Sequence, residues 1–196
     1  MRNGLNSGRR PTGPPSKKAT REERTLVFID ESGFCLLPAR LYTYAPRGVT
    51  PILKVPLKHE HLSVIGAITP QGKLFHQVYD HAISKAEVVQ FLRHLLRQIE
   101  GKLLVIWDGL PAHRSRLVKQ FLTEGAAQRL HLVQLPGYAP ELNPVEGLWN
   151  HLKRVQLGNV CCAHLTELRQ ALRNAVERVR HRTALISSFF QQPGYL

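Results

Sequence analysis

The sequence predicts an α/β fold in which helices flank a mixed five-stranded sheet. Two observations support this prediction. Short apolar runs bounded by turn residues fill much of the N-terminal half, as expected for strands. Farther along the chain, segments with helical periodicity alternate with further apolar runs. The chain has 196 residues, 43% of them hydrophobic, which is enough for one domain with a sizeable core.

Four strands are predicted in the N-terminal half. Leu26–Asp30 is mostly apolar, as a central strand requires. Leu41–Ala45 and Leu62–Thr69 have the composition of further strands. The turn residues at 70–72 then connect Leu62–Thr69 to Leu74–Tyr79, and this predicts a hairpin.

A helix, a strand and a second helix are predicted next. Ser84 and Glu87 have the spacing of a capping box, and an apolar helical face continues from there until Gly101. Lys102–Asp108 is a strand with an uninterrupted apolar centre. A second helix is predicted over 115–124, with a serine as its N-cap.

Three elements complete the fold. Leu130–Leu135 is predicted as the last core strand, and Pro144–Val155 as a helix with proline in its first turn. A last amphipathic helix is predicted over Leu165–Arg182. This order of elements matches the ribonuclease H-like fold, in which the strands that end at Asp30 and Asp108 lie side by side at the centre of the sheet.

Residues 1–24 are predicted to form a disordered basic tail, and residues 25–196 the folded domain. The tail holds seven basic and two acidic residues, several prolines and glycines, and little apolar material to bury. Such a segment can act as an arm along a DNA backbone, and a linker from an upstream domain is an equally good interpretation.

The charge of the whole chain is unusual. It carries 27 Lys and Arg against 14 Asp and Glu, a net charge of +13, with a pI near 10.2. This excess favours a polyanionic partner, because neutralised phosphates release their counterions. A basic protein without a specific ligand, or one associated with the ribosome, is the alternative.

The cysteine content and the hydropathy indicate in which cellular compartment the protein is expected. Cys35, Cys161 and Cys162 form no CxxC pair and leave an odd number, which argues against a disulfide framework or a zinc site and suits a reducing cytosol. No apolar run approaches the roughly 20 residues needed to cross a bilayer. We therefore expect a cytoplasmic protein that makes no contact with a membrane.

Three acidic residues lie at the end or at the start of predicted core elements. Asp30 and Asp108 each end an apolar strand, and Glu146 lies at the start of a helix. Carboxylates that meet at a sheet edge repel one another unless a cation lies between them. Two divalent ions about 3.5–4 Å apart would satisfy all three and suit a phosphoryl displacement. The all-oxygen ligand set favours Mg²⁺ or Mn²⁺.

Each acidic residue also has a simpler explanation. Asp30 can cap a turn, with Glu31 as the true ligand beside it. Asp108 and Gly109 together form a turn signal. Glu146 can stabilise a helix N-terminus electrostatically without binding a metal.

The motifs around these residues resemble those of the DDE transposases of the Tc/mariner superfamily, in particular its bacterial insertion-sequence branch. The resemblance extends from about residue 25 to the C-terminus. It is carried by FIDESGF at 28–34, WDGLPAHRS at 107–115 and, most specifically, LPGYAPELNPVEGLWNHLKR at 135–154. Many relatives have Asn at the position of Gly109, so no ligand role is assigned there.

The resemblance implies a metal-dependent polynucleotidyl transferase with Asp30, Asp108 and Glu146 as catalytic metal ligands. Asp30 would bridge two Mg²⁺ or Mn²⁺ ions. Activated water would cleave DNA at the end of a transposon, and the freed 3′-hydroxyl would then attack the target DNA. No covalent protein–DNA intermediate is implied.

Several basic residues are candidates for contact with DNA phosphates. His113 and Ser115 match residues of the second family motif. His113 either touches a phosphate, orients the second aspartate, or is an ordinary loop histidine without a role at the site. Trp107 and Trp149 are predicted to be core aromatics. The remaining phosphate candidates are Arg47, Lys54, Lys58, Arg114, Lys153 and Arg154.

The partners implied are double-stranded DNA, both transposon ends and target, and a second copy of the chain when DNA is bound. Relatives read their inverted repeats with helix-turn-helix modules upstream of the catalytic domain. We expect a separately encoded helix-turn-helix subunit here, or else a truncated remnant. Two rivals stay open: a housekeeping nuclease of the ribonuclease H-like fold, and a catalytically inactive DNA-binding remnant.

Overall fold

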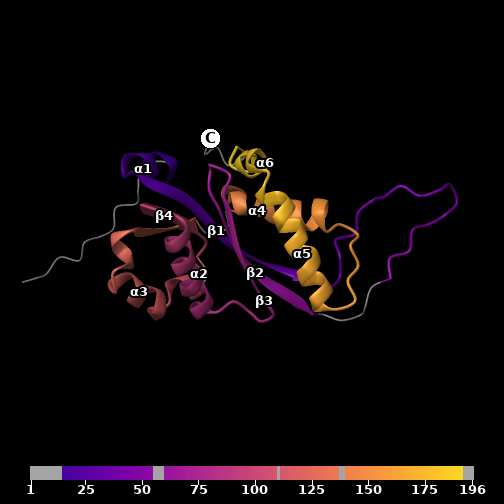
Figure 1. The fold of residues 1–196 in the computed structure, drawn as a ribbon, viewed down its shortest axis with the longest axis horizontal. Helices are drawn as coiled ribbons and strands as arrows, with labels where there is room; N and C mark the ends of the chain where they lie inside the picture. The colour runs from indigo at the N-terminus through magenta and orange to yellow at the C-terminus, as the bar shows by residue number, and fades with distance from the viewer. Residues whose placement is uncertain (1–14, 55–59, 110, 137–139, 192–196) are drawn as a thin grey trace, which may run out of the picture.

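The computed structural model describes residues 15–54, 60–109, 111–136 and 140–191, and its centre is one five-stranded sheet (Figure 1). The strands lie in the order β3-β2-β1-β4-β5. This confirms the mixed five-stranded sheet predicted from the sequence. The strands are β1 (Arg24–Cys35), β2 (His61–Ile68), β3 (Leu74–Tyr79), β4 (Lys102–Trp107) and β5 (Leu130–Gln134).

The pairing of β1 determines where the candidate aspartates lie. β1 pairs with β2 in the antiparallel direction and with β4 in the parallel direction. Phe28 of β1 lies opposite Ile106 of β4. The same offset places Asp30 beside Asp108, just past the end of β4. The predicted adjacency of these two strands is therefore confirmed.

Helices cover both faces of the sheet (Figure 1). Alternate residues of β1 belong to different cores: Phe28 packs into one hydrophobic cluster, and Val27 and Ile29 pack into the other. This alternation follows from the two-residue period of a strand. The face of Val27 is covered by α2 (Lys85–Gln98) and α3 (Arg116–Thr123), and the face of Phe28 by α4 (Pro144–Asn150), α5 (Leu165–Arg180) and α6 (Thr183–Ser188).

The predicted helix starts are confirmed at three places. Ser84 and Glu87 form the capping box of α2, and Ser115 accepts a hydrogen bond from the backbone of α3. Asn143 caps α4, whose first residue is Pro144. Beyond α4 the chain continues as a π-helix, η4 (His151–Gln156), and short 3₁₀ helices occupy η1 (Pro111–Arg114), η2 (Ala126–Gln128) and η3 (Pro140–Leu142).

The strand predicted at Leu41–Ala45 is wrong. Among the described residues no strand pairs with this segment, and the side chains of Tyr42 and Tyr44 are fully exposed. Figure 1 shows the chain between β1 and β2 extending away from the sheet. In its place, β1 itself continues past Asp30 to Cys35 and pairs with β2 over that length.

The chain ends also differ from the prediction. Part of the predicted tail is helical: α1 (Pro15–Arg21) packs beside β1 and buries Ala19 in the core, while residues 1–14 lie outside the described part of the chain. The helix predicted over 165–182 is α5, which ends at Arg180, and a further short helix, α6, follows it. None of the described helices combines the length and the hydropathy that crossing a bilayer requires.

Candidate active site

Asp30 is a buried acidic residue at the centre of the sheet. Its side chain points to the face covered by α4, where Trp149 lies, and the residue is 8% exposed. The indole Nε1 of Trp149 donates a hydrogen bond of 2.8 Å to Oδ2 of Asp30. This contact fixes one oxygen of the carboxylate relative to the helix that carries Glu146.

Trp149 is held in place by its neighbours. Its ring meets Phe34 edge-on, with 6.0 Å between the ring centroids. It also covers Gly66 of β2 so closely that a Cβ atom there would overlap the indole. The prediction that Trp149 is a core aromatic is confirmed, since it is 3% exposed. Its role as a hydrogen-bond donor to Asp30 was missed, because sequence patterns do not show which buried indole faces a carboxylate.

The three candidate carboxylates influence one another. Burial raises the pKa of Asp30 to about 7, even though the hydrogen bond from Trp149 lowers it. This pKa includes a smaller upward contribution from the negative charges of Glu146 and Asp108. Glu146 is exposed in the first turn of α4. Asp30 thus lies within electrostatic reach of both Glu146 and Asp108.

Asp108 is bound by His113. The 3₁₀ turn η1 brings His113 back over the end of β4, where its ring stacks on Trp107 at 4.2 Å with an angle of 1° between the planes. Nδ1 of His113 lies 2.8 Å from Oδ1 of Asp108 and 3.2 Å from its carbonyl oxygen. Burial alone lowers the pKa of His113, but the hydrogen bonds to Asp108 and Glu31 outweigh it and raise the pKa to about 9.

Glu31 lies on the other side of β1 from Asp30. Its Oε1 is 3.4 Å from Nε2 of His113, so it joins the cluster of Asp108 rather than that of Trp149. The sequence predicts Asp30 as the metal ligand, with Glu31 as the alternative. Strand alternation separates them, and only Asp30 faces α4.

The candidate phosphate contacts occupy different settings. Lys153 lies in η4, where Nζ donates to Oγ of Ser32 at 2.7 Å and sits 5.3 Å from the ring centroid of Phe34. Arg154 is exposed beside it. His113 is almost completely buried, and both of its ring nitrogens face carboxylates. Arg47 and Lys54 are exposed on the segment between β1 and β2, while Lys58 and the side chain of Arg114 lie outside the described residues.

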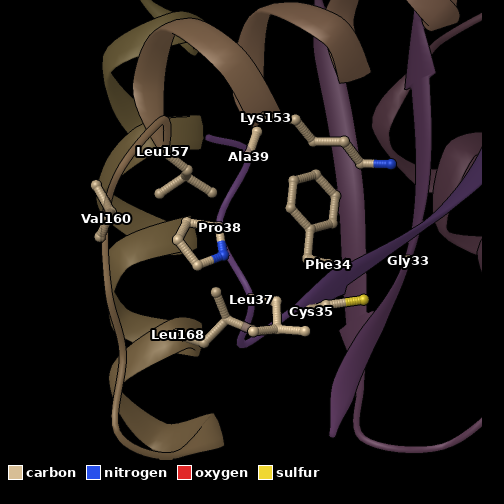
Figure 2. Close-up of a pocket in the computed structure, with 10 residues that line it drawn as sticks. All are labelled: Gly33, Phe34, Cys35, Leu37, Pro38, Ala39, Lys153, Leu157, Val160 and Leu168. Carbon is tan, nitrogen blue, oxygen red and sulfur yellow. The ribbon is translucent and has the colours of Figure 1, made fainter. Parts of the chain in front are cut away.

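A cavity of about 190 Å³ lies next to Lys153, between the end of β1, η4 and the start of α5 (Figure 2). Its lining is mainly apolar and includes Phe34, Leu37, Leu157 and Leu168. None of the three candidate carboxylates lines it. It is a hydrophobic cleft behind the basic side chain rather than part of the acidic cluster.

The acidic cluster fits a hard divalent cation in its chemistry. All three side chains offer carboxylate oxygens, the ligands that Mg²⁺ and Mn²⁺ prefer. Burial, and to a lesser degree the charges of Glu146 and Asp108, disfavour the ionised form of Asp30 and raise its pKa, and a bound cation would favour that form. Within the described residues, no three His, Cys, Asp or Glu side chains are arranged closely enough to hold a metal ion. Asp108, one of the candidate ligands, is turned toward His113.

Solved structures share this fold. The chain superposes on the Mos1 strand transfer complex with a TM-score of 0.65 and 13% identity, covering 98% of this chain and 63% of that one. For the mariner Mos1 paired end complex with Mg, the TM-score is 0.65 at 15% identity, with 98% and 65% covered. The Mos1 transposase catalytic domain with Raltegravir and Mg gives 0.58 at 11% identity, with 92% and 85% covered. The chain therefore spans just under two thirds of the Mos1 chain in the first two of these complexes.

A comparison with curated proteins gives no significant match. A family model described as DDE superfamily endonuclease matches residues 25–169, which include all three candidate carboxylates. The match covers most of the chain and begins within β1. The chain belongs to the DDE endonuclease superfamily.

Proposed function

We propose that this chain is the catalytic domain of a Tc/mariner-like DDE transposase, of the bacterial insertion-sequence branch, which cleaves DNA at transposon ends and joins them to a target. The observation that carries the proposal is the convergence of Asp30, Asp108 and Glu146. Asp30 and Asp108 are carried by two adjacent parallel strands and Glu146 by the helix packed on them, and the charges of Glu146 and Asp108 both raise the pKa of Asp30. The solved Mos1 complexes are paired-end and strand-transfer assemblies of a protein with the same fold.

Asp30, Asp108 and Glu146 are the proposed ligands of two Mg²⁺ or Mn²⁺ ions. When bound, such ions activate water and neutralise charge on the phosphate under attack. The protein's own contribution is orientation. Trp149 fixes Asp30 through Oδ2, and His113 holds Asp108 through Oδ1. We assign His113 this orienting role rather than a DNA contact, because its side chain is only 1% exposed.

DNA binding is proposed to use the basic residues near the acidic cluster. Lys153 and Arg154 follow Glu146 on the same helical stretch, and Arg114 follows His113. The net charge of +13 supports a double-stranded DNA partner. We also propose that the protein acts as a dimer on DNA and that a separately encoded helix-turn-helix subunit assists it. Its proposed location is the bacterial cytoplasm.

The test uses purified protein and duplex DNA that carries the flanking ends of the element. The wild-type chain, with the helix-turn-helix subunit added where one is encoded nearby, is expected to nick this DNA only when Mg²⁺ or Mn²⁺ is present. Asp108→Ala should abolish nicking, whereas Asp80→Ala, in an exposed turn, should leave it unchanged. Nicking that survives in Asp108→Ala contradicts the proposal. Cleavage of RNA–DNA hybrid without action on duplex ends would favour the housekeeping nuclease.

A further inference from the structure

Glu31 is an acidic side chain at the site with no place in the proposed ligand set. It follows Asp30 directly on β1, yet its side chain lies on the opposite face of the strand and is 18% exposed. Its described contact is with His113, where Oε1 is 3.4 Å from Nε2. A residue in this position either binds a metal itself or acts through His113.

His113 is restrained by the groups around it. Trp107 fixes the plane of its ring by parallel stacking. Nδ1 faces Oδ1 and the carbonyl oxygen of Asp108, and Nε2 faces Glu31. Because an ionised carboxylate only accepts hydrogen bonds, each ring nitrogen acts as a donor in this arrangement. Stacking leaves the ring free to rotate within its own plane, and the contact with Glu31 limits that rotation.

Asp108 needs such a restraint more than Asp30 does. Asp30 lies within a strand, buried and bonded to Trp149. Asp108 follows the last residue of β4, and its side chain is 38% exposed. A ligand at a strand end has several rotamers available unless a neighbour selects one. His113 restrains Asp108 in this way through its side chain.

We propose that Glu31 is a positioning residue of the metal site: it accepts a hydrogen bond from Nε2 of His113 and so fixes the imidazole that orients the Asp108 carboxylate. This inference rests on the proposed metal-dependent function. Partners that orient ligands in this way typically change metal affinity by about 10–100-fold when they are removed. Glu31 thus supports Asp108 from the strand that also carries Asp30.

The rival role for Glu31 is direct coordination of a cation. The two roles differ in what they require of the side chain. A hydrogen-bond acceptor can be replaced by the amide oxygen of glutamine, whereas a metal ligand of this kind needs the negative charge. Glu31→Gln therefore separates the two roles, and Glu31→Ala removes both.

The experiment measures Mn²⁺ binding by isothermal titration calorimetry in the absence of DNA. Glu31→Ala is expected to bind Mn²⁺ about 10–100-fold more weakly than wild type. Glu31→Gln is expected to stay within about threefold, because a neutral acceptor still satisfies Nε2. Glu100→Ala, an exposed glutamate before β4, is the matched control and should be unchanged. Equal losses in Glu31→Gln and Glu31→Ala would overturn the proposal, as would no loss in either.

A double-mutant cycle tests whether Glu31 acts through His113. In His113→Asn the side-chain amide replaces Nδ1 as a donor to Asp108, but nothing replaces Nε2. Adding Glu31→Ala to this variant is expected to weaken Mn²⁺ binding by less than about twofold, because the contact is already lost. A full 10–100-fold loss in this background would show that Glu31 acts independently and would contradict the inference.

Asp108→Asn separates this inference from the proposed function. If Asp108→Asn binds Mn²⁺ as tightly as wild type, the proposed metal site itself is wrong. If Asp108→Asn loses binding while Glu31→Ala keeps it, only the role of Glu31 is wrong. Thermal unfolding of each metal-free variant checks the fold, and Glu31→Ser takes the place of Glu31→Ala if the alanine variant does not fold.

Discussion

At the scale of single residues, the three carboxylates of the site have different surroundings. Asp30 is buried and bonded to Trp149, Asp108 is half-exposed and bonded to His113, and Glu146 is exposed at a helix start. Burial is costly for a carboxylate, and the neighbouring negative charges add to the cost. The metal-free protein therefore carries a local destabilisation at Asp30, which a bound cation would relieve.

The first prediction concerns the pH dependence of stability at Asp30. The pKa of Asp30 is about 7 in the folded protein, well above its ordinary value of 3.8. The unfolded chain loses this proton at lower pH, so the group lowers stability progressively as pH rises from about 4 to 7. Asp30→Asn cannot ionise and keeps an acceptor for Trp149. Each pKa unit corresponds to about 1.4 kcal/mol, so Asp30→Asn should be a few kcal/mol more stable at pH 8.

Chemical denaturation of metal-free protein at pH 4 and pH 8 measures this effect. The difference between wild type and Asp30→Asn should be small at pH 4 and large at pH 8. Mn²⁺ should stabilise wild type at pH 8 and have much less effect on the variant. A variant that is less stable than wild type at pH 8 would contradict this description of Asp30.

At the scale of elements, local chemistry predicted the helix starts well. The capping box of α2 and the Asn143 cap before Pro144 depend only on residues within one turn, so the sequence contains all the information they need. The core strands were also predicted, since their apolar runs are long enough to be buried on both faces. The positions of Asp30, Asp108 and Glu146 could then be inferred from the fold.

The sequence predictions were wrong or incomplete where the structure of a segment depends on contacts with residues far away in the sequence. Leu41–Ala45 has strand-like composition, but a strand needs a neighbouring strand, and no described strand pairs with this segment. The contact of Glu31 with His113 spans 82 residues. The alternation of side chains along β1 was the one signal available, since it places Glu31 and Asp30 on opposite faces. It does not identify the partner.

The second prediction concerns the contact between β2 and α4. A Cβ atom at Gly66 would overlap the indole of Trp149, so Gly66→Ala must displace the ring that binds Asp30. We expect a loss of about 1–3 kcal/mol in stability, as for overpacked cores, and weaker Mn²⁺ binding. Gly33→Ala on β1 is the matched control, because nothing lies within 4 Å of its added Cβ. If the two variants unfold at the same denaturant concentration, the close packing of Trp149 on Gly66 does not contribute to stability as predicted.

At the scale of the whole molecule, the net positive charge and the three acidic residues are expected to bind different partners. The net charge of +13 acts over the whole surface and favours binding of a polyanion. The acidic cluster lies at the centre of the sheet and would itself repel DNA without cations. A basic molecule with a carboxylate site in its middle is the arrangement expected for an enzyme that holds a nucleic acid over bound metal ions.

The third prediction concerns the salt dependence of DNA binding. The logarithm of the binding constant should fall linearly with the logarithm of the salt concentration. Replacing both Lys153 and Arg154 by alanine should weaken binding and reduce this slope by about 2, one for each phosphate contact. Lys119→Ala on α3, away from η4, should change the slope much less. Fluorescence anisotropy at four salt concentrations measures it, and an unchanged slope in the double variant would exclude these two residues as phosphate contacts.

The central claim is that Asp30, Asp108 and Glu146 form a single site for divalent cations, and Mn²⁺ titration of four proteins tests it most directly. Wild type is compared with Asp30→Asn, Asp108→Asn and Glu146→Gln by calorimetry at pH 7.5. Each substitution removes one charge and changes the shape of the side chain little. The account predicts that every one of the three weakens Mn²⁺ binding by about tenfold or more. Wild-type affinity in any of the three variants would contradict it.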